Sequence, residues 1–376
     1  MSISYAESLP DFQKDTTVPF ADMLHGFHLA PSLTVNEGYD DNINLSSGSK
    51  DSGFTTTVIP QLMLSYKTVN ADLSFSYQAS AQFVNGQSVL NTVSHLASLN
   101  SRYQLSQTTQ LQIQDGFAYS PDATVINPTG VVTARTNQYS NSVSATVSQK
   151  LSALTSVNVM YTYSILRYES SDLVDSDAHG VQLTMSQEFT HADTINTTIG
   201  INYFIFDTGD SEKTYLLSLG WMHHFSKTFS LNATGGANLF QDTNNHYTPS
   251  GLFNVVMEKS WKHTSAILTA QQNLGVSGGV VSGIVVNQAV ILSIQERLTQ
   301  KLGANLSGIY ATNKSVSGSA INTVTYSGVV GFDYQILVWL KGQMQYTYYQ
   351  QDSHGTASDT IRRNQGFLGL RATLPN

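Results

Sequence analysis

Apolar and polar residues alternate with a period of two along most of this chain. Between residues 73 and 83, for example, Leu, Phe, Tyr and Ala alternate with Ser and Gln. A β-strand directs successive side chains to opposite faces, so each such segment predicts a strand with one apolar and one neutral, polar face. Charged residues make up only 12% of the chain, whereas the polar faces of soluble sheets usually carry many Lys and Glu. An apolar exterior around a polar interior is typical of a transmembrane β-barrel.

The alternation predicts an all-β fold: a single closed antiparallel transmembrane β-barrel of about 18 strands, within a range of about 16 to 20. Short links such as 68–70 alternate with longer ones such as 121–133, as expected of periplasmic turns and extracellular loops. This alternation predicts periplasmic N- and C-termini, with a tail over 1–24 and the barrel over 25–376. The predicted strands are 25–42, 53–67, 71–85, 92–105, 109–120, 134–150, 154–168, 178–190, 193–207, 213–225, 228–242, 248–260, 264–276, 282–298, 301–312, 321–336, 338–350 and 361–374.

Composition narrows the class further. No run of about 18 apolar residues exists, which excludes a helical membrane span. The chain has no cysteine, hence no disulfide, thiolate metal site or c-type haem attachment, and its net charge of −8 disfavours nucleic acid as a partner. A soluble β-solenoid or propeller is the alternative fold, but no sequence motif recurs every 20–50 residues. Residues 1–24 lack the basic start and apolar core of a signal peptide, so we expect a mature or truncated sequence.

Two segments fit the alternation poorly. Asp115 falls on the apolar face of its predicted strand, which indicates either a bulge or a slip in the assigned register. The predicted strand 282–298 is apolar on both faces around Val285, Val286 and Val290, which predicts an apolar patch that occludes the lumen.

The first predicted hairpin carries a recognisable pattern. It reads Pro-Ser-Leu-Thr-Val-Asn-Glu-Gly-Tyr-Asp-Asp-Asn over residues 31–42, and Pro60-Gln61-Leu62 follows in the second strand. This resembles the outer-membrane β-barrel porins often encoded beside exopolysaccharide and exosortase systems. Specific identities are confined to about residues 29–66, and the hairpin layout is similar over most of the chain. The resemblance implies an outer-membrane barrel that serves polysaccharide passage, with polysaccharide-export components as partners. It transfers no binding or catalytic residue.

Catalysis and cofactor binding find no support in the sequence. Residues 275–279 match Gly-x-Ser-x-Gly, but a nucleophile elbow needs a strand-to-helix turn, and this segment joins two predicted strands. His223 and His224 lie on opposite faces of a predicted strand, so they cannot ligate one ion together. We expect no enzyme, no cofactor and no metal centre.

Charged residues are predicted on the lumen face near the periplasmic ends. Opposed charges there would create a field across the pore that orients polar solutes; alternatively, they pair around the rim and hold the barrel's shape. Four lumen-facing aromatic residues toward the extracellular mouth could stack on sugar rings or pack against inward-folded loops. The pore-lining candidates are Asp72, Arg102, Glu188, Glu258, Arg297, Asp333, Lys341 and Arg371, with Phe204, Phe206, Phe240 and Tyr349.

The predicted outer loops are acidic. Asp175 and Asp177, with Asp207, Asp210 and Glu212, are candidate Ca²⁺ ligands because they place oxygen ligands at short spacing; an incidental solvated loop is the alternative. Outer-membrane lipid and lipopolysaccharide are the expected surroundings, and bridging lipopolysaccharide phosphates to an acidic surface would require divalent ions. The remaining acidic residues of these loops are Asp40, Asp41, Asp51, Asp172 and Asp242.

These features favour passive transport across a Gram-negative outer membrane, because an 18-stranded barrel is wide enough for an aqueous channel. Walls rich in hydroxyl and amide groups suit sugars or polysaccharide better than a strongly ion-selective pore. The alternative is a structural sheath or anchor whose lumen holds its own loops or a partner such as an electron-transfer cytochrome.

Overall fold

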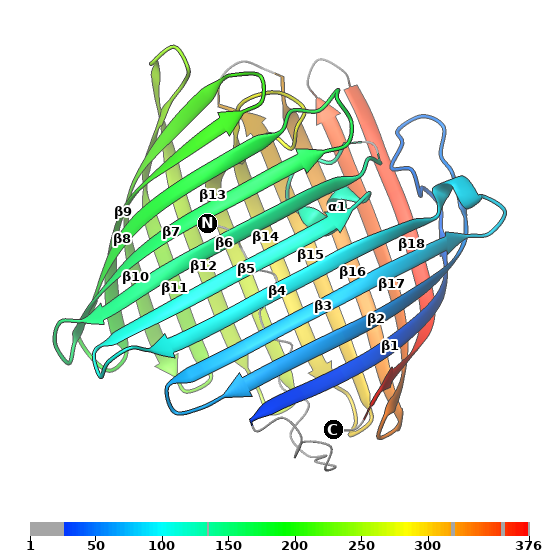
Figure 1. Ribbon diagram of the computed structural model, residues 1–376, viewed down its shortest axis with the longest axis horizontal. Coiled ribbons are helices and arrows are strands. Elements are labelled where there is room, and N and C mark those ends of the chain that lie inside the picture. Colours follow the sequence, from blue (N-terminus) through cyan, green and yellow to red (C-terminus); the bar gives the residue numbers. More distant parts are fainter. Residues whose placement is uncertain (1–25, 134, 317–319, 355–357, 375–376) are drawn as a thin grey trace.

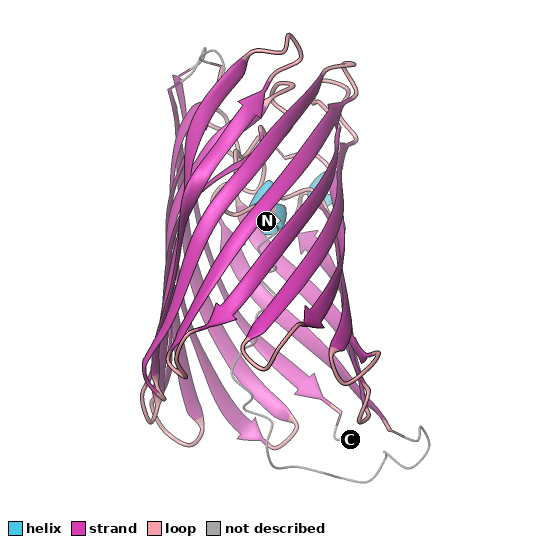
Figure 2. Ribbon diagram, turned by 90° about the vertical axis from the view of Figure 1, so that its left-hand side faces the viewer, coloured by secondary structure: helices cyan, strands magenta, loops and turns pink. Residues whose placement is uncertain are grey.

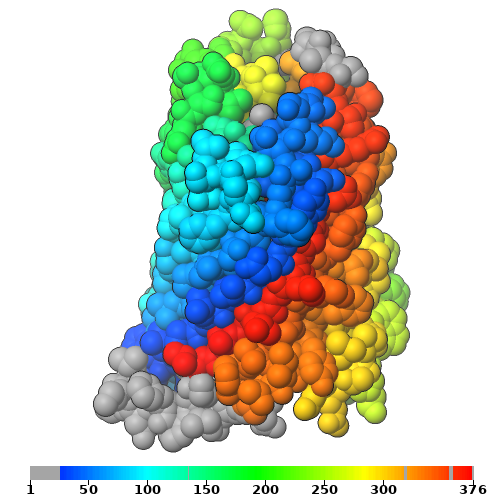
Figure 3. All heavy atoms as spheres, turned by 90° about the vertical axis from the view of Figure 1, so that its right-hand side faces the viewer, coloured from blue at the N-terminus to red at the C-terminus, as the bar shows by residue number. Residues whose placement is uncertain are grey.

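The computed structural model describes residues 26–133, 135–316, 320–354 and 358–374. These residues form one sheet of 18 antiparallel strands in which each strand pairs with its neighbours in sequence. The first strand also pairs with the last, from Ser32 opposite Thr373 to Asp40 opposite Gln365, and this pairing closes the sheet into a barrel. In Figure 3 the blue first strands lie directly beside the red last strands. The predicted fold is therefore confirmed, while the predicted tail over 1–24 lies outside the described residues.

The strands differ from their predicted bounds by only a few residues at each end. They are β1 (Phe27–Asp40), β2 (Gly53–Lys67), β3 (Ala71–Val84), β4 (Thr92–Gln104), β5 (Thr109–Ser120), β6 (Gln138–Lys150), β7 (Thr155–Tyr168), β8 (Ser176–Glu188), β9 (Asp193–Phe206), β10 (Ser211–Ser226), β11 (Phe229–Gln241), β12 (Tyr247–Ser260), β13 (Thr264–Val276), β14 (Ile284–Arg297), β15 (Leu302–Ser315), β16 (Asn322–Leu337), β17 (Leu340–His354) and β18 (Ser358–Thr373). Two helical turns, η2 (Ser88–Leu90) and α1 (Ala123–Ile126), lie in loops.

Each strand turns its apolar face outward and its polar face into the lumen. In β10, Leu217 and Leu219 are exposed on the outer surface, whereas Ser218 between them is 4% exposed. The register keeps equivalent faces together, since Leu217 lies opposite Ile199 of β9 and Ala237 of β11. The barrel therefore presents an apolar belt to its surroundings and a hydrophilic wall to its interior, as a transmembrane barrel must.

The two ends of the barrel differ. Tight turns such as Lys227-Thr228, between β10 and β11, join strands at one end. Long loops, of which residues 121–137 are an example, join them at the other end, and Figure 2 shows the contrast. We refer to these as the turn end and the loop end. No helix among the described residues is long and apolar enough to cross a membrane.

Asp115 corrects the sequence interpretation. The register of β5 runs without a shift against both β4 and β6, so neither a bulge nor a slip moves this side chain. Asp115 lies opposite Leu99 and Val143, on the outer face and at the middle of its strand. The alternation of faces is therefore regular in β5, and Asp115 is an acidic residue at an outward position that is apolar elsewhere in this strand.

The predicted apolar patch on β14 is divided between the two faces. Ala289 and Ile291 face the lumen and form a small cluster with Ala311 of β15. Val290 lies on the outer surface and is 44% exposed.

Candidate functional site

The lumen wall consists mainly of neutral hydrogen-bonding side chains. Hydroxyl pairs join neighbouring strands across it, with Ser76 and Ser98 at 2.8 Å and Thr184 and Thr198 at 2.9 Å. Amide side chains behave similarly, since Gln343 Nε2 donates to Asn36 Oδ1 at 2.7 Å. Such a wall offers donors and acceptors to polar solutes without a strong charge preference.

One loop enters this lumen from the loop end. Residues 121–133 and 135–137, which we call the mouth loop, belong to the link between β5 and β6 and carry α1 inside the barrel, as Figures 1 and 2 show. Asp122 caps α1 by accepting the backbone N–H of Thr124 at 2.9 Å. This cap satisfies an N–H group that the first turn of a helix otherwise leaves unbonded.

The mouth loop is bound to strands distant from its own hairpin. The side-chain amide of Gln351 on β17 accepts from the N–H of Val132 and donates to its carbonyl, both at 2.8 Å. The Nδ2 atoms of Asn287 on β14 and Asn313 on β15 donate to the carbonyl of Thr129, at 2.8 and 3.0 Å. Since β5 and β6 lie eight or more strands from β14 in the barrel order, the loop spans the lumen.

A buried ion cluster fixes the start of the mouth loop. Arg363 on β18 donates to Asp122 and, through Nε at 2.8 Å and Nη2 at 2.5 Å, to Asp40 at the end of β1. Asp40 is fully buried and Arg363 is 8% exposed. Burial raises the pKa of Asp122, but the charge of Arg363 and the hydrogen bonds from Thr124 and Arg363 outweigh it and lower the pKa below 3.8. Asp40 is thus a buried ion-pair partner. The sequence pattern had placed it among the acidic residues of the outer loops, and the structure corrects that assignment.

Arg135 fixes the other end of the mouth loop. Its guanidinium donates to the carbonyl of Leu90 at 2.9 Å, to the hydroxyl of Thr92 at 3.1 Å and to the carbonyl of Ile43 at 3.3 Å. These groups belong to the loops and strand ends beside β1 and β4. The loop is therefore held at its start, its middle and its end.

The four predicted lumen aromatics support the loops instead of lining open space. Phe204, Phe206 and Phe240 are 1–8% exposed and pack together with Ile284. Tyr349 is 4% exposed and packs in a second cluster with Leu45, Ala123, Val132 and Ile361. Because their rings are covered, the structure favours the packing interpretation over sugar stacking.

The eight predicted lumen charges lie on the inner face near the turn end. Asp72 and Arg102 are opposite each other on β3 and β4, and Arg371 donates to Gln61 at 2.9 Å. Asp72 is 4.0 Å from Lys67, and Glu188 is 3.4 Å from His191. Among the described residues, no ion pair joins two of the seven charges Asp72, Arg102, Glu188, Glu258, Asp333, Lys341 and Arg371.

The five candidate Ca²⁺ ligands do not form a site. Arg167 lies 2.6 Å from Asp177 and 3.6 Å from Asp175, so a cation of the chain itself already faces these carboxylates. Asp210 accepts from Ser282 at 2.8 Å, and Glu212 is buried at 7% exposure. In the described parts of the chain, no group of three His, Cys, Asp or Glu side chains is arranged to hold a metal ion.

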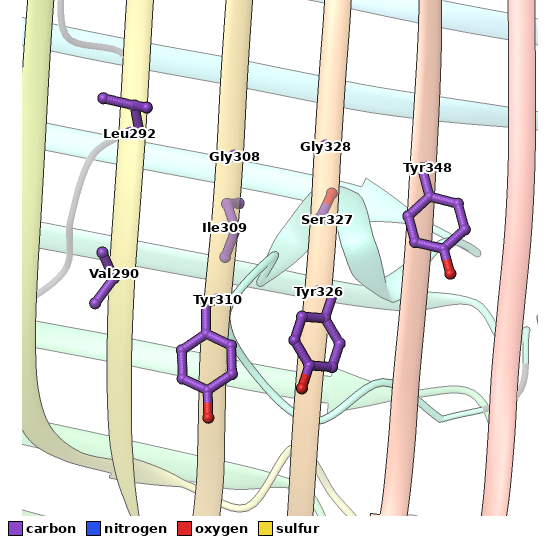
Figure 4. A pocket seen from close by; sticks show the side chains of 9 residues that line it. All are labelled: Val290, Leu292, Gly308, Ile309, Tyr310, Tyr326, Ser327, Gly328 and Tyr348. Atoms are coloured by element: carbon purple, nitrogen blue, oxygen red, sulfur yellow. The ribbon is translucent and has the colours of Figure 1, made fainter.

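Two further features are separate from the mouth loop and from the charged residues at the turn end. Ser277 of the Gly-x-Ser-x-Gly match lies between β13 and β14, is 1% exposed, and donates to the carbonyl of Val281. Gly308 and Gly328 form the floor of a depression flanked by Tyr310, Tyr326 and Tyr348 (Figure 4). These tyrosines share the outer face of β15–β17, so the depression faces outward.

The mouth loop and its binding residues were not identified from sequence. Two signals could have indicated the loop: the link is unusually long, and it carries apolar residues such as Ala123 and Val132, which an outward loop would expose and which are 9% and 4% exposed here. The partners Gln351 and Arg363 had no signal, because inward Gln and Arg are ordinary residues of such strands.

Comparisons with known proteins give one family match and several similar solved structures. Residues 23–182 match the model of a family described as "Putative beta-barrel porin 2". No curated protein matches the chain. Among solved structures, Pseudomonas aeruginosa OccK9 (OpdG) is 12% identical, with 93% of this chain and 99% of that chain covered and a TM-score of 0.47. Acinetobacter baumannii OccAB4 is 11% identical over 92% and 98%, also at 0.47.

Proposed function

We propose that this protein is an outer-membrane channel that gives polar solutes passive passage through a lumen narrowed by the mouth loop. The apolar belt on the outer face supports placement of the barrel in a lipid bilayer. The neutral polar wall of the lumen supports passage of solutes such as sugars. The tight turns support the assignment of the turn end to the periplasmic side, and we place both termini on that side as well. Passage is diffusive in this proposal, and no catalytic step is involved.

The observation that carries the proposal is the path of the mouth loop. It crosses from β5 to β14–β17 and is bound there by Gln351, Asn287 and Asn313. A segment fixed in the lumen restricts the cross-section and thereby the size of solute that passes. Passage of exported polysaccharide, with polysaccharide-export components as partners, would then require the mouth loop to leave its position.

The alternative function is a structural sheath or anchor. The loop-end clusters around Phe240 and Tyr349 favour it, since loops already fill part of the lumen there. A partner such as an electron-transfer cytochrome would then enter from the turn end, where the charged residues lie.

Planar-bilayer recording of the purified full chain separates the two functions. The channel proposal predicts discrete, ohmic conductance steps, together with sugar-driven swelling of vesicles that contain the protein. Folded protein that inserts but gives neither steps nor swelling would overturn the channel and favour the sheath.

A further inference from the structure

Lysines in the turns of the turn end are gathered in one sector of the rim. Eight turns join strands there, all within the described residues, and Lys227, Lys262 and Lys301 are the only Lys, Arg, Asp or Glu that they contain. These lysines belong to the turns β10–β11, β12–β13 and β14–β15, which follow one another around the barrel. Neighbouring strands lie about 4.8 Å apart, so successive turns are about 10 Å apart. One sector therefore presents three ammonium groups at close spacing.

These three lysines are exposed, and no carboxylate of the chain neutralises them. In the part of the chain that the structure describes, none of them forms an ion pair. Two carboxylates lie at nearby strand ends. Glu296 accepts from the hydroxyl of Thr264, and Glu258 lies on the lumen face opposite Ser230. The three ammonium groups are therefore available to an anion outside the chain.

A fourth lysine lies beside them among aromatic rings of the outer face. Lys259 Nζ is 5.6 Å from the ring centre of Phe229 and 5.8 Å from that of Trp261, and it donates to the hydroxyl of Thr228 at 3.3 Å. Phe225 stacks on Phe229 with ring centres 4.8 Å apart. Phe225 and Trp261 are 53% and 55% exposed. Exposed rings at the end of an apolar belt are typical of the border between acyl chains and head groups, so these lysines lie at head-group level.

The lysines and the rings together fit one ligand, an anionic phospholipid. Its phosphate carries a charge that the rest of the head group does not compensate, and lysines near a bilayer surface attract such lipids. Its acyl chains meet the rings, whose apolar bodies favour the interface. Lysine stems can lie along apolar surface while their ammonium groups stay at head-group level. An acidic protein would match the charge, but it would not provide acyl chains for the rings.

We propose that this sector of the turn end binds the phosphate groups of anionic phospholipids in the adjacent leaflet. We call it the basic sector. This inference rests on the proposed placement of the barrel in a bilayer, and it is independent of whether the lumen conducts. The basic sector consists of Lys227, Lys259, Lys262 and Lys301, with the rings of Phe225, Phe229 and Trp261.

Fluorescence quenching of Trp261 tests the basic sector directly. W221F/W339F leaves Trp261 as the only tryptophan of the chain, and bromine atoms on lipid acyl chains quench a ring that they contact. The full chain is reconstituted in phosphatidylcholine bilayers that contain a small fraction of brominated phosphatidylglycerol or of brominated phosphatidylcholine. We expect phosphatidylglycerol to be enriched beside Trp261 by about five-fold or more, because each lysine near the surface attracts the anionic lipid. The enrichment should shrink in 1 M salt, where the Debye length is about 3 Å.

Removal of charge gives the matched comparison. In the same background, Lys227→Gln/Lys262→Gln should lose most of the enrichment. Lys67→Gln/Lys150→Gln, at the ends of β2 and β6 in another part of the rim, should retain it. Equal quenching by the two brominated lipids, or equal loss of enrichment in both variants, would overturn the proposal. Quenching by neither lipid would overturn it too, and would also contradict the placement of the turn end in a bilayer. If a variant lacks the heat-induced gel shift of a folded barrel, the comparison of the two lipids in the unsubstituted background decides.

Discussion

The side-chain amide of Gln351 binds both the N–H and the carbonyl of Val132, each at 2.8 Å, although 219 residues separate the two in sequence. This pairing reproduces the hydrogen bonds that a neighbouring strand would make. It satisfies the backbone hydrogen-bonding groups of a segment that crosses the lumen away from β5 and β6, the strands that it links. The mouth loop is thus held by specific bonds and does not merely rest in the lumen.

Removal of this amide should release the middle of the mouth loop. Gln351→Leu leaves the N–H and carbonyl of Val132 without partners, which should destabilise the docked loop by about 1–3 kcal/mol. Trypsin should then cut after Arg135, which is protected in wild type by its own bonds. Gln350→Leu, on the outer face of the same strand, is the control and should leave the protection unchanged. Equal protection in both variants would show that the amide does not hold the loop.

The buried guanidinium should matter more than its exposed neighbour. Arg363→Met leaves Asp40 and Asp122 without their cation, and loss of one partner from a buried ion pair costs about 3–5 kcal/mol. Arg362→Met, at the adjacent exposed position, should cost less than about 1 kcal/mol. Urea titration of the folded barrel in lipid vesicles, combined with trypsin cleavage of the loop, measures both effects. Comparable losses in the two variants would contradict the role assigned to Arg363.

Acid should release the mouth loop only well below neutral pH. The folded pKa of Asp122 is lower than its ordinary value of 3.8. The ionised group therefore contributes its full stabilisation above that ordinary value, and the contribution is lost as the pH falls through the lowered folded pKa. We expect constant channel conductance from pH 7 to about 4 and an increase only in stronger acid. An opening transition between about pH 5 and 7 would show that a different group controls the loop.

The bases at the turn end should tune ion selectivity without being required for folding. In the triple variant with Arg102, Lys341 and Arg371 replaced by Gln, the remaining Asp72, Glu188 and Asp333 should shift the reversal potential toward cation selectivity. The shift should shrink in 1 M salt, where the Debye length is about 3 Å. Sugar-driven vesicle swelling should be largely retained. Failure of the variant to fold would favour the alternative in which these charges hold the rim together.

The barrel was predictable from sequence because apolar and polar residues alternate with a period of two along most strands. Leu217, Ser218 and Leu219 illustrate the rule: their faces follow from parity alone, and the pairing of β10 with its neighbours obeys it. The positions of the links between strands predicted the strand bounds to within a few residues. Local pattern is sufficient here because each strand pairs with its sequence neighbours.

The packing of loops inside the loop end of the barrel was not predictable in this way. Whether Phe240 and Tyr349 face water or protein depends on where loops fold, and loop paths are set by contacts between distant residues such as Asp122 and Arg363. Asp115 shows a different limit. Its face followed correctly from the pattern, but the acidic residue on that face was interpreted as a bulge or a slip in register, whereas the register of β5 is regular.

Single-channel conductance before and after removal of the mouth loop tests the central claim most directly. Residues 123–136 are replaced by a short Gly-Ser linker, which leaves β5 and β6 intact, and both proteins are recorded in the same bilayer at high salt. If the loop narrows an otherwise open lumen, wild type should conduct and the shortened variant should conduct substantially more. Equal conductance in the two proteins, or none in either although both insert as folded barrels, would contradict the account.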